Sequence, residues 1–261
     1  MKLVGFVGTG KMGGALASAV IKKVGGDKVM LADAQIEKAK AIADEFGCNF
    51  GSSNDVVKNC KFAFLGVKPQ VMQAVADSIK ADISDDTILV SMAAGISIER
   101  IENMFGKRPI IRIMPNTPVS VGEGMILYCA NELVKEEDIN EFVEMLALSG
   151  KLDALDEKLI DAASAVSGCG PAFVYLFMQA MADGGVKCGL PREKALAYAE
   201  QTVLGAATLA LKSGEHPEKL KDDVCSPGGT TIEGVRAMEE NGVRAAMINA
   251  VTAAYEKSKK L

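Results

Sequence analysis

Six residues near the start of the chain, Gly8-Thr9-Gly10-Lys11-Met12-Gly13, have the types and spacing of a phosphate-binding turn. A short apolar run, residues 2–7, precedes them, and a helix-like sequence, residues 15–21, follows. In a strand–turn–helix unit the first glycine permits the tight turn, the second lets the backbone approach a pyrophosphate, and the third lets helix and strand pack closely. Free N–H groups at the start of the helix favour an anion. The stretch therefore predicts a dinucleotide-binding turn, and the alternative is a glycine-rich turn that binds no ligand.

Asp33 is the next residue whose position suggests contact with a dinucleotide. It stands 20 residues beyond Gly13, at the end of a predicted strand over residues 28–33. A carboxylate at this place holds the ribose 2′-OH of NAD and repels the 2′-phosphate of NADP. The alternative is a strand-end Asp that caps the next helix, predicted over residues 36–46. No Arg stands nearby to accept a 2′-phosphate, and Lys38 is the closest cation.

Strands and helices alternate through the first half of the chain. Further strands are predicted over residues 61–67, 87–92 and 110–114, with helices between them. This order predicts a parallel sheet with helices on both faces, an α/β doubly wound domain of the Rossmann type over residues 1–152. In such sheets the ligand lies outside the carboxyl ends of the strands.

The carboxyl ends of these strands supply further candidates for cofactor binding. Lys68 could be a catalytic lysine, or its backbone could line the nicotinamide pocket where a strand turns into a helix. Asn116 could bind cofactor or substrate, or serve only as a turn residue. The predicted cofactor-binding residues are Gly8, Thr9, Gly10, Lys11, Met12, Gly13, Asp33, Asn54, Val67, Lys68, Pro69, Ala93, Ala94, Gly95 and Asn116.

Beyond about Leu152 the strand pattern ends, and residues 153–261 are predicted to form an all-helical domain. One of its helices, opened by Gly168-Cys169-Gly170-Pro171, is apolar on nearly every face between Phe173 and Met181. A helix of this kind is buried, yet about 100 residues supply little core in which to bury it. We therefore expect a partner subunit to complete its burial, the alternative being a central helix within one subunit.

Composition argues against several classes of function. The 261 residues carry a net charge of -5, so no basic surface favours nucleic acid. The apolar run Pro171–Ala182 is shorter than the ~20 residues of a membrane span, and no signal-peptide profile begins the chain, so we expect a cytoplasmic protein that binds no membrane. The single histidine, His216, argues against a metal site and suits a surface or capping role. Six widely spaced cysteines without C-x-x-C indicate free, buried thiols in a reducing compartment.

Seven segments, spread over nearly the whole chain, form one recognisable series: Gly8–Gly13, Val67–Gln70, Ala93–Ser97, Arg112–Pro118, Ser167–Ala172, Ala182–Val186 and Lys221–Thr231. In this order they resemble the pyrroline-5-carboxylate reductase family. The Ser-Pro-Gly-Gly-Thr-Thr stretch, residues 226–231, is the most specific, whereas the glycine turn alone fits many dehydrogenases. Cys169 departs from the family pattern, which often has Ser at this position.

The resemblance implies a dinucleotide domain and a helical domain through which two subunits interlock, with dimers that assemble into a decamer in many members. It also implies reduction of 1-pyrroline-5-carboxylate to L-proline with NADPH or NADH. NADPH ranks first on the resemblance, whereas Asp33 by itself favours NADH. By the same resemblance Thr230 and Thr231 hold the substrate, and the Thr231 hydroxyl is the candidate partner of the ring nitrogen.

The loop that carries these threonines has a physical reason to bind an anion. It opens a predicted helix, whose N–H groups and dipole suit the carboxylate of the substrate. The alternative is a helix cap in which Thr satisfies its own helix. Hydride transfer to a protonated imine needs no strong general acid, so a chain with one histidine can catalyse it by positioning the reactants. The substrate-binding candidates are Gly228, Gly229, Thr230 and Thr231, and Thr231 is the catalytic candidate.

Two other functions stay open on the sequence. A β-hydroxyacid dehydrogenase-like enzyme shares the glycine start and a helical second domain. Such enzymes use a lysine on the interdomain helix, whereas the helix from Pro171 has none before Lys187. A non-catalytic dinucleotide-binding regulator would lack anion donors in its second domain, and the loop at residues 228–231 argues against it.

Overall fold

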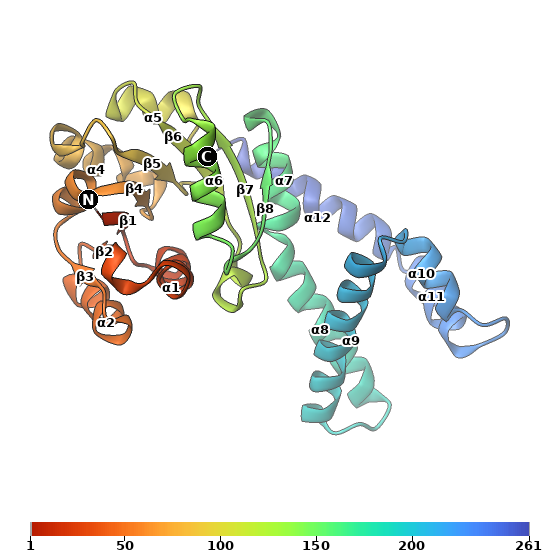
Figure 1. Cartoon of the computed structure of the whole chain (residues 1–261). Coiled ribbons are helices and arrows are strands. Elements are labelled where there is room, and N and C mark those ends of the chain that lie inside the picture. The colour runs from red at the N-terminus through yellow and green to blue at the C-terminus, as the bar shows by residue number, and fades with distance from the viewer. Residues whose placement is uncertain (1, 261) are drawn as a thin grey trace. The chain divides into compact units, whose positions relative to one another are not determined.

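The computed structural model describes residues 2–260, which fold into two compact units. The first unit runs to Cys169 and takes in the chain again from Ala254 onward. The second unit comprises residues Gly170–Ala253. The first is built on a sheet and the second is entirely helical (Figure 1).

The division differs from the predicted boundary between residues 152 and 153. The helix over residues 160–167 packs against the sheet, so it belongs to the first unit. The side-chain amide of Asn116 reinforces this packing by donating to the carbonyl oxygen of Ser167, at 2.9 Å. The change from strands to helices along the sequence is therefore not the place where the compact units divide.

The first unit contains an eight-stranded sheet with the order β3-β2-β1-β4-β5-β6-β7-β8. β7 is antiparallel to β6, and every other neighbouring pair is parallel. The chain leaves β1 toward β2 and β3 and then returns to β4 on the other side of β1, which creates a switch point between β1 and β4. The strands are β1 Lys2–Val7, β2 Val29–Ala32, β3 Asn49–Phe50, β4 Cys60–Leu65, β5 Ile88–Ser91, β6 Ile110–Met114, β7 Gly124–Ala130 and β8 Gly150–Ala154.

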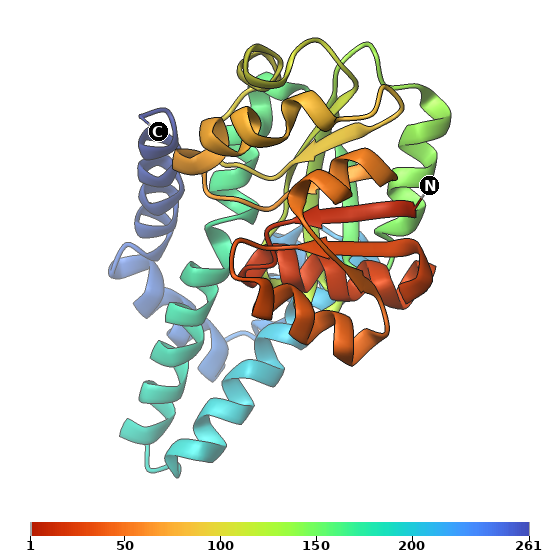
Figure 2. The ribbon, with the colours of Figure 1, turned by 90° about the vertical axis from the view of Figure 1, so that its left-hand side faces the viewer.

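Helices cover both faces of this sheet, as Figures 1 and 2 show, and each face has its own core. On one face Leu16 and Phe142 pack with Phe6 and Phe64, whose rings stack with their centroids 4.6 Å apart. The other face buries residues of α3, α4 and α5. The predicted doubly wound domain is confirmed. Its helices are α1 Lys11–Val24, α2 Ile36–Phe46, α3 Ser53–Asn59, α4 Met72–Ile79, α5 Ile98–Phe105, α6 Glu136–Met145 and α7 Ile160–Ser167.

The second unit has little core of its own. Its buried hydrophobic cluster consists of Ala182, Ala195 and Ala199, where α8 packs beside α9. α8 leaves Leu176 73% and Tyr175 58% exposed, so the alternative of a central helix buried within one subunit is wrong. The helices of the unit are α8 Gly170–Lys187, α9 Arg192–Ser213, α10 Pro217–Val224, α11 Thr230–Glu240 and α12 Val243–Ser258, of which α12 ends in the first unit.

The apolar run over residues 171–182 belongs to a longer helical stretch than the sequence suggested. The segment Glu157–Lys187 spans 31 residues, with a turn at Gly168 and Cys169 between α7 and α8, and by length and composition alone it could cross a membrane. The expectation that the segment is too short for a span is therefore wrong. A helix whose apolar surface is covered by other protein segments meets the same criterion, because length and composition alone decide it.

Two smaller expectations are confirmed. His216 is the N-cap of α10, where its Nδ1 accepts a hydrogen bond from the Glu218 backbone N–H at 3.2 Å. All six cysteines are free, as expected, but Cys169 and Cys188 are exposed, so the expectation of burial is wrong for these two. Burial raises the pKa of Cys60 to about 12 and that of Cys129 to about 11, so both thiols stay protonated near neutral pH.

Candidate functional site

The glycine turn joins β1 to α1 at the switch point of the sheet. Gly8 has φ +97°, and a Cβ there would lie 2.6 Å from the carbonyl oxygen of Gly66, which follows β4. A Cβ on Gly13 would lie 2.2 Å from the Gly8 carbonyl oxygen. A Cβ on Gly10 would meet nothing within 4 Å. Gly8 and Gly13 therefore allow close backbone packing, while Gly10 leaves open the space that a pyrophosphate would fill.

Gly66 is a member of this turn that the sequence reasoning missed. Its backbone N–H donates to the Val7 carbonyl oxygen at 2.8 Å, and a Cβ on it would lie 2.5 Å from the Gly8 carbonyl oxygen. The available signal was a glycine directly after the buried strand β4. Its importance depends on β4 lying beside β1, which only the strand order reveals.

Asp33 binds the glycine turn itself. Its Oδ2 accepts hydrogen bonds from the Thr9 backbone N–H at 2.7 Å and from the Thr9 hydroxyl at 3.1 Å. Its Oδ1 accepts from the Gln35 N–H at 2.9 Å. Partial burial raises the pKa of Asp33, but these hydrogen bonds and nearby Lys38 outweigh it, so the pKa lies below its ordinary value. Asp33 is therefore ionised at neutral pH and fixes the shape of the turn.

A cavity of about 640 Å³ opens beside the turn, within the size range of small-molecule sites. Thr9, Gly10 and Lys11, all predicted to bind cofactor, form part of its wall. Three lysines, Lys11, Lys22 and Lys38, give the wall a positive charge that suits phosphate groups. The remaining lining residues, which the sequence reasoning did not select, are Gly14, Ala15, Ser18, Ala19, Lys22, Lys38, Ile42, Val119, Ser120, Val121, Gly122 and Leu148.

Two other predicted segments lie at the same edge of the sheet. Residues 67–69 follow β4 and residues 93–95 follow β5, and β1, β4 and β5 are parallel neighbours. In the register, Val7 stands opposite Leu65 and Leu65 opposite Ser91, so the three strands end side by side. The structure brings these loops together, and their binding of a dinucleotide stays a prediction.

Three further predicted residues have structural partners. The Asn54 amide nitrogen donates to the Ser78 carbonyl oxygen at 3.1 Å and also to the Asp82 carboxylate. The Asn116 amide nitrogen is bound to Ser167, and its Oδ1 accepts from the Met125 N–H at 2.8 Å. Met12 packs against a core of the sheet. Asn54 and Asn116 thus hold elements of the fold together, and none of the three lines the cavity beside the turn.

The predicted substrate loop lies in the second unit, before α11. Gly228 has φ +67°, and Gly229 is the N-cap of α11, so the alternative of a threonine N-cap is wrong. The Gly229 N–H donates to the Ser226 carbonyl oxygen at 3.0 Å. Among the described residues, no side chain caps this helix. The N–H groups of Thr230 and Thr231 stand in the first turn, where a helix has no backbone partner for them.

The hydroxyls of Thr230 and Thr231 also differ from those of other helical threonines. Thr202, Thr208 and Thr252 each donate to the carbonyl oxygen four residues earlier, at 2.6–2.9 Å. Thr230 and Thr231 begin their helix, so no helical carbonyl lies four residues before them. Both residues are exposed, and their hydroxyls are thus placed to meet a ligand.

The doubly wound sheet, the glycine turn at its switch point and the helical unit define a nicotinamide-dinucleotide-dependent oxidoreductase of the two-domain kind. Residues 3–95 match the family model "NADP oxidoreductase coenzyme F420-dependent", and residues 157–261 match "Pyrroline-5-carboxylate reductase dimerisation". The pyrroline-5-carboxylate reductase of Arabidopsis thaliana is 42% identical over 99% of this chain and 95% of its own length. That of Escherichia coli (strain K12) is 40% identical over 100% and 98%. The chain belongs to the pyrroline-5-carboxylate reductase family.

Solved structures agree with this assignment. The Plasmodium falciparum pyrroline carboxylate reductase with NADP bound has a TM-score of 0.89 and 34% identity, covering 99% of this chain and 97% of that one. The Coxiella burnetii pyrroline-5-carboxylate reductase has a TM-score of 0.92 and 29% identity, covering 99% and 98%. Mycobacterium tuberculosis 3-hydroxyisobutyrate dehydrogenase has a TM-score of 0.52 and 16% identity, covering 88% and 72%. Its likeness to this chain is one of fold alone.

Proposed function

We propose that this chain reduces 1-pyrroline-5-carboxylate to L-proline with hydride from NADPH or NADH, the last step of proline biosynthesis. The observation that carries the proposal is the helix start at residues 228–231, whose backbone N–H groups are free to bind an anion. Membership of the reductase family over the full chain supports it. A dehydrogenase acting on β-hydroxyacids has only the fold in its favour. A non-catalytic regulator would not need this loop.

NAD(P)H, when bound, supplies the hydride. The residues that would hold it are those of the glycine turn, since the open space at Gly10 fits a pyrophosphate and the lysines beside it fit its charge. The N–H groups of Thr230 and Thr231 hold the substrate carboxylate, and the Thr231 hydroxyl contacts the ring nitrogen. A protonated imine is already electrophilic, so the protein contributes mainly position, which can supply about 7–11 kcal/mol.

A single assay tests the proposal against its alternatives. Purified protein is mixed with NADPH or NADH and 1-pyrroline-5-carboxylate, and in parallel with NAD⁺ and 3-hydroxyisobutyrate. We expect oxidation of the reduced cofactor only with the pyrroline, with L-proline as the product. Turnover of the hydroxyacid alone would support the β-hydroxyacid enzyme. Dinucleotide binding without turnover of either substrate would support the regulator.

The geometry at Asp33 predicts how cofactor preference responds to its substitution. Because the carboxylate binds Thr9, Asp33→Asn should raise the KM of NADPH and NADH together, by about tenfold, the effect of losing a hydrogen bond to a charged group. The NADPH to NADH ratio of KM should change less than threefold. Thr9→Val, which removes only the hydroxyl bond, is the matched control and should have a smaller effect in the same direction. If only the NADPH to NADH ratio of KM changed, the result would instead support the predicted contact of Asp33 with the ribose.

The exposed surface of α8 supports an assembly of subunits. We propose that a second copy of the chain covers this surface in a homodimer, and that dimers assemble further, into a decamer as in many family members. A second copy of the chain would cover the exposed apolar surface of α8, so no membrane is needed to explain that surface. The net charge of -5 argues against nucleic acid, and six free cysteines support a cytoplasmic location.

A further inference from the structure

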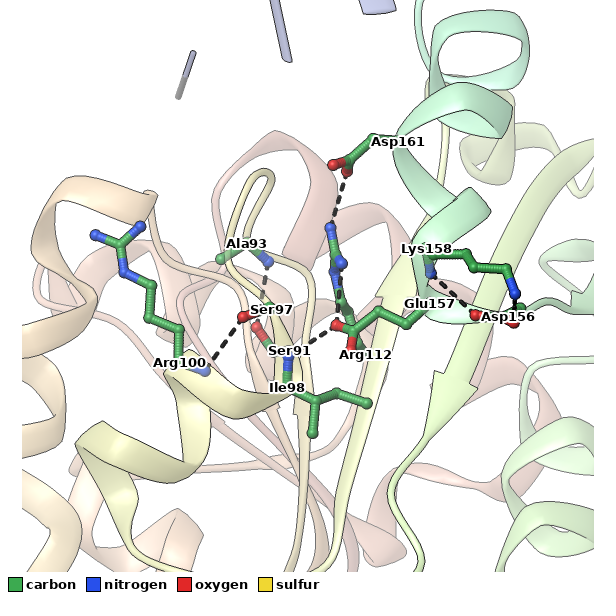
Figure 3. Close-up of polar contacts among 10 residues, drawn as sticks. All are labelled: Ser91, Ala93, Ser97, Ile98, Arg100, Arg112, Asp156, Glu157, Lys158 and Asp161. Atoms are coloured by element: carbon green, nitrogen blue, oxygen red, sulfur yellow. Dashed lines mark hydrogen bonds and ion pairs between the residues drawn. The ribbon is translucent and has the colours of Figure 1, made fainter. Parts of the chain in front are cut away.

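Arg112 is a buried cation at the centre of the first unit. It lies on β6, and its side chain is 4% exposed. Its guanidinium binds two carboxylates, with Nη1 at 3.1 Å from Glu157 Oε1 and Nη2 at 3.0 Å from Asp161 Oδ1 (Figure 3). The two acids stand one helical turn apart, in the 3₁₀ turn Glu157–Leu159 and the following α7. Arg112 therefore ties the sheet to the start of α7.

Glu157 has a second partner that Asp161 lacks. The same Oε1 that binds Arg112 accepts a hydrogen bond from the Ile98 backbone N–H at 2.8 Å. Ile98 is the first residue of α5, so this N–H has no partner within the helix. A carboxylate at this end of a helix is stabilised by the helix dipole. Glu157 thus connects Arg112 to the beginning of α5, as Figure 3 shows.

The segment just before α5 is the loop that follows β5. It contains Ala93, Ala94 and Gly95, which we predict to line the cofactor, and Gly95 has φ +73°. One end of the loop is held where the Ala93 N–H donates to Ser91 Oγ at 3.4 Å. The other end is held by the cap that Ser97 makes to the Arg100 N–H and by Glu157. The conformation of the loop therefore depends on where Glu157 stands.

Stability alone does not account for the buried arginine. Replacing a buried ion pair by apolar residues is often neutral or stabilising, and the Nε of Arg112 is buried without a hydrogen-bond partner among the described residues. The ion pairs are also not the only contacts that hold α7, because the Asn116 amide nitrogen binds the carbonyl oxygen of Ser167 at the far end of that helix. What the ion pairs add is a fixed position for Glu157.

We propose that Arg112 and Glu157 are positioning residues for the dinucleotide: Arg112 holds Glu157, and Glu157 sets the loop over residues 93–97 in its binding conformation. The proposal rests on the proposed cofactor site, since it assigns that loop to the cofactor. Neither residue touches the reacting atoms, and both act through the backbone of the loop.

The two carboxylates of Arg112 provide a matched pair of variants. The side chains of Glu157 and Asp161 are each 33% exposed and each bind one arm of Arg112, but only Glu157 holds the loop. Dissociation constants for NADPH are measured on the full chain from the fluorescence of the bound nicotinamide, which no tryptophan disturbs because the chain has none. Thermal unfolding is measured on the same samples.

Glu157→Ala should raise the Kd of NADPH about tenfold, the effect of losing a hydrogen bond to a charged group. Arg112→Met should raise it similarly. Glu157→Gln, which keeps an acceptor for the Ile98 N–H, should restore most of the affinity, and Asp161→Ala should change Kd less than twofold while lowering Tm as much as Glu157→Ala.

Equal changes in Kd for Glu157→Ala and Asp161→Ala, or no change for either, would overturn the positioning role. The proposed cofactor site is tested separately by Gly10→Val, whose substitution lies on another loop. If Gly10→Val binds NADPH as the wild type does, the site itself is wrong. If Gly10→Val loses binding while Glu157→Ala keeps it, only the role of Arg112 and Glu157 fails.

Discussion

Gly10→Val should weaken NADPH binding by up to about 100-fold and leave the protein folded. A Cβ at Gly10 meets no atom of residues 2–260 within 4 Å, and Gly10 has φ -64° and ψ -170°, which any amino acid adopts. The valine side chain would therefore occupy only the space assigned to the pyrophosphate. Crowding of this kind costs about 1–3 kcal/mol, or up to about 100-fold in affinity. Titration of NADPH fluorescence measures the loss.

Gly13→Ala is the informative comparison, since its added atom meets the protein itself. The new Cβ would stand 2.2 Å from the Gly8 carbonyl oxygen, so α1 must move away from the turn. We expect a loss of about 2 kcal/mol in unfolding free energy and a Tm lower by about 4–8 °C. Gly10→Ala should keep the wild-type Tm and bind NADPH with intermediate affinity. Normal NADPH binding by Gly10→Val would contradict the assignment of the turn to the dinucleotide.

Thr231→Ala should lower kcat/KM for 1-pyrroline-5-carboxylate by about 10- to 100-fold, while the Kd of NADPH changes less than twofold. The factor corresponds to loss of a hydrogen bond to a charged partner, here the protonated ring nitrogen. The structure makes the substitution mild for the fold, because Thr231 is exposed and Gly229 already forms the N-cap. Steady-state kinetics with both substrates varied would separate the two effects.

Two further variants serve as controls for Thr231→Ala. Thr231→Ser keeps the hydroxyl and should retain activity within about threefold. Thr252→Ala removes a hydroxyl that donates to its own helix, to Ile248 at 2.9 Å, and should leave kcat/KM unchanged. If Thr231→Ala lost pyrroline turnover and NADPH affinity in equal measure, the loop would belong to the fold or to the cofactor, and the substrate would bind elsewhere.

The parallel half of the sheet was predictable because its signals are local. Helix α2 spans residues Ile36–Phe46 and β6 spans residues Ile110–Met114, as the sequence predicted. Buried strands of a parallel sheet read as continuous apolar runs, and helix starts carry caps such as the Ser52–Asp55 capping box. The edge of the sheet beyond β6 was not predicted. β8 is a half-exposed edge strand with the sequence Gly-Lys-Leu-Asp-Ala, which lacks such a run.

The site was predictable where a motif is contiguous and not where it depends on two distant segments. The stretch Gly8–Gly13 is contiguous, and the sequence indicated each of its residues. Gly66 acquires its role only from contact with Gly8, and Asp33 only from its bonds to Thr9. Arg112 was noticed merely as part of a resemblance, since its partners stand 45 and 49 residues further along the chain.

The small core of the second unit affects how a newly made chain folds. Three alanines bury too little apolar surface to offset the chain entropy of a unit that spans residues Gly170–Ala253. We therefore expect this part of a newly made chain to stay incompletely folded until it meets a second copy, so that maturation includes a bimolecular step. Expression level then controls folding yield by mass action. A cell that makes little of this protein would lose more of it to proteases before the copies find each other.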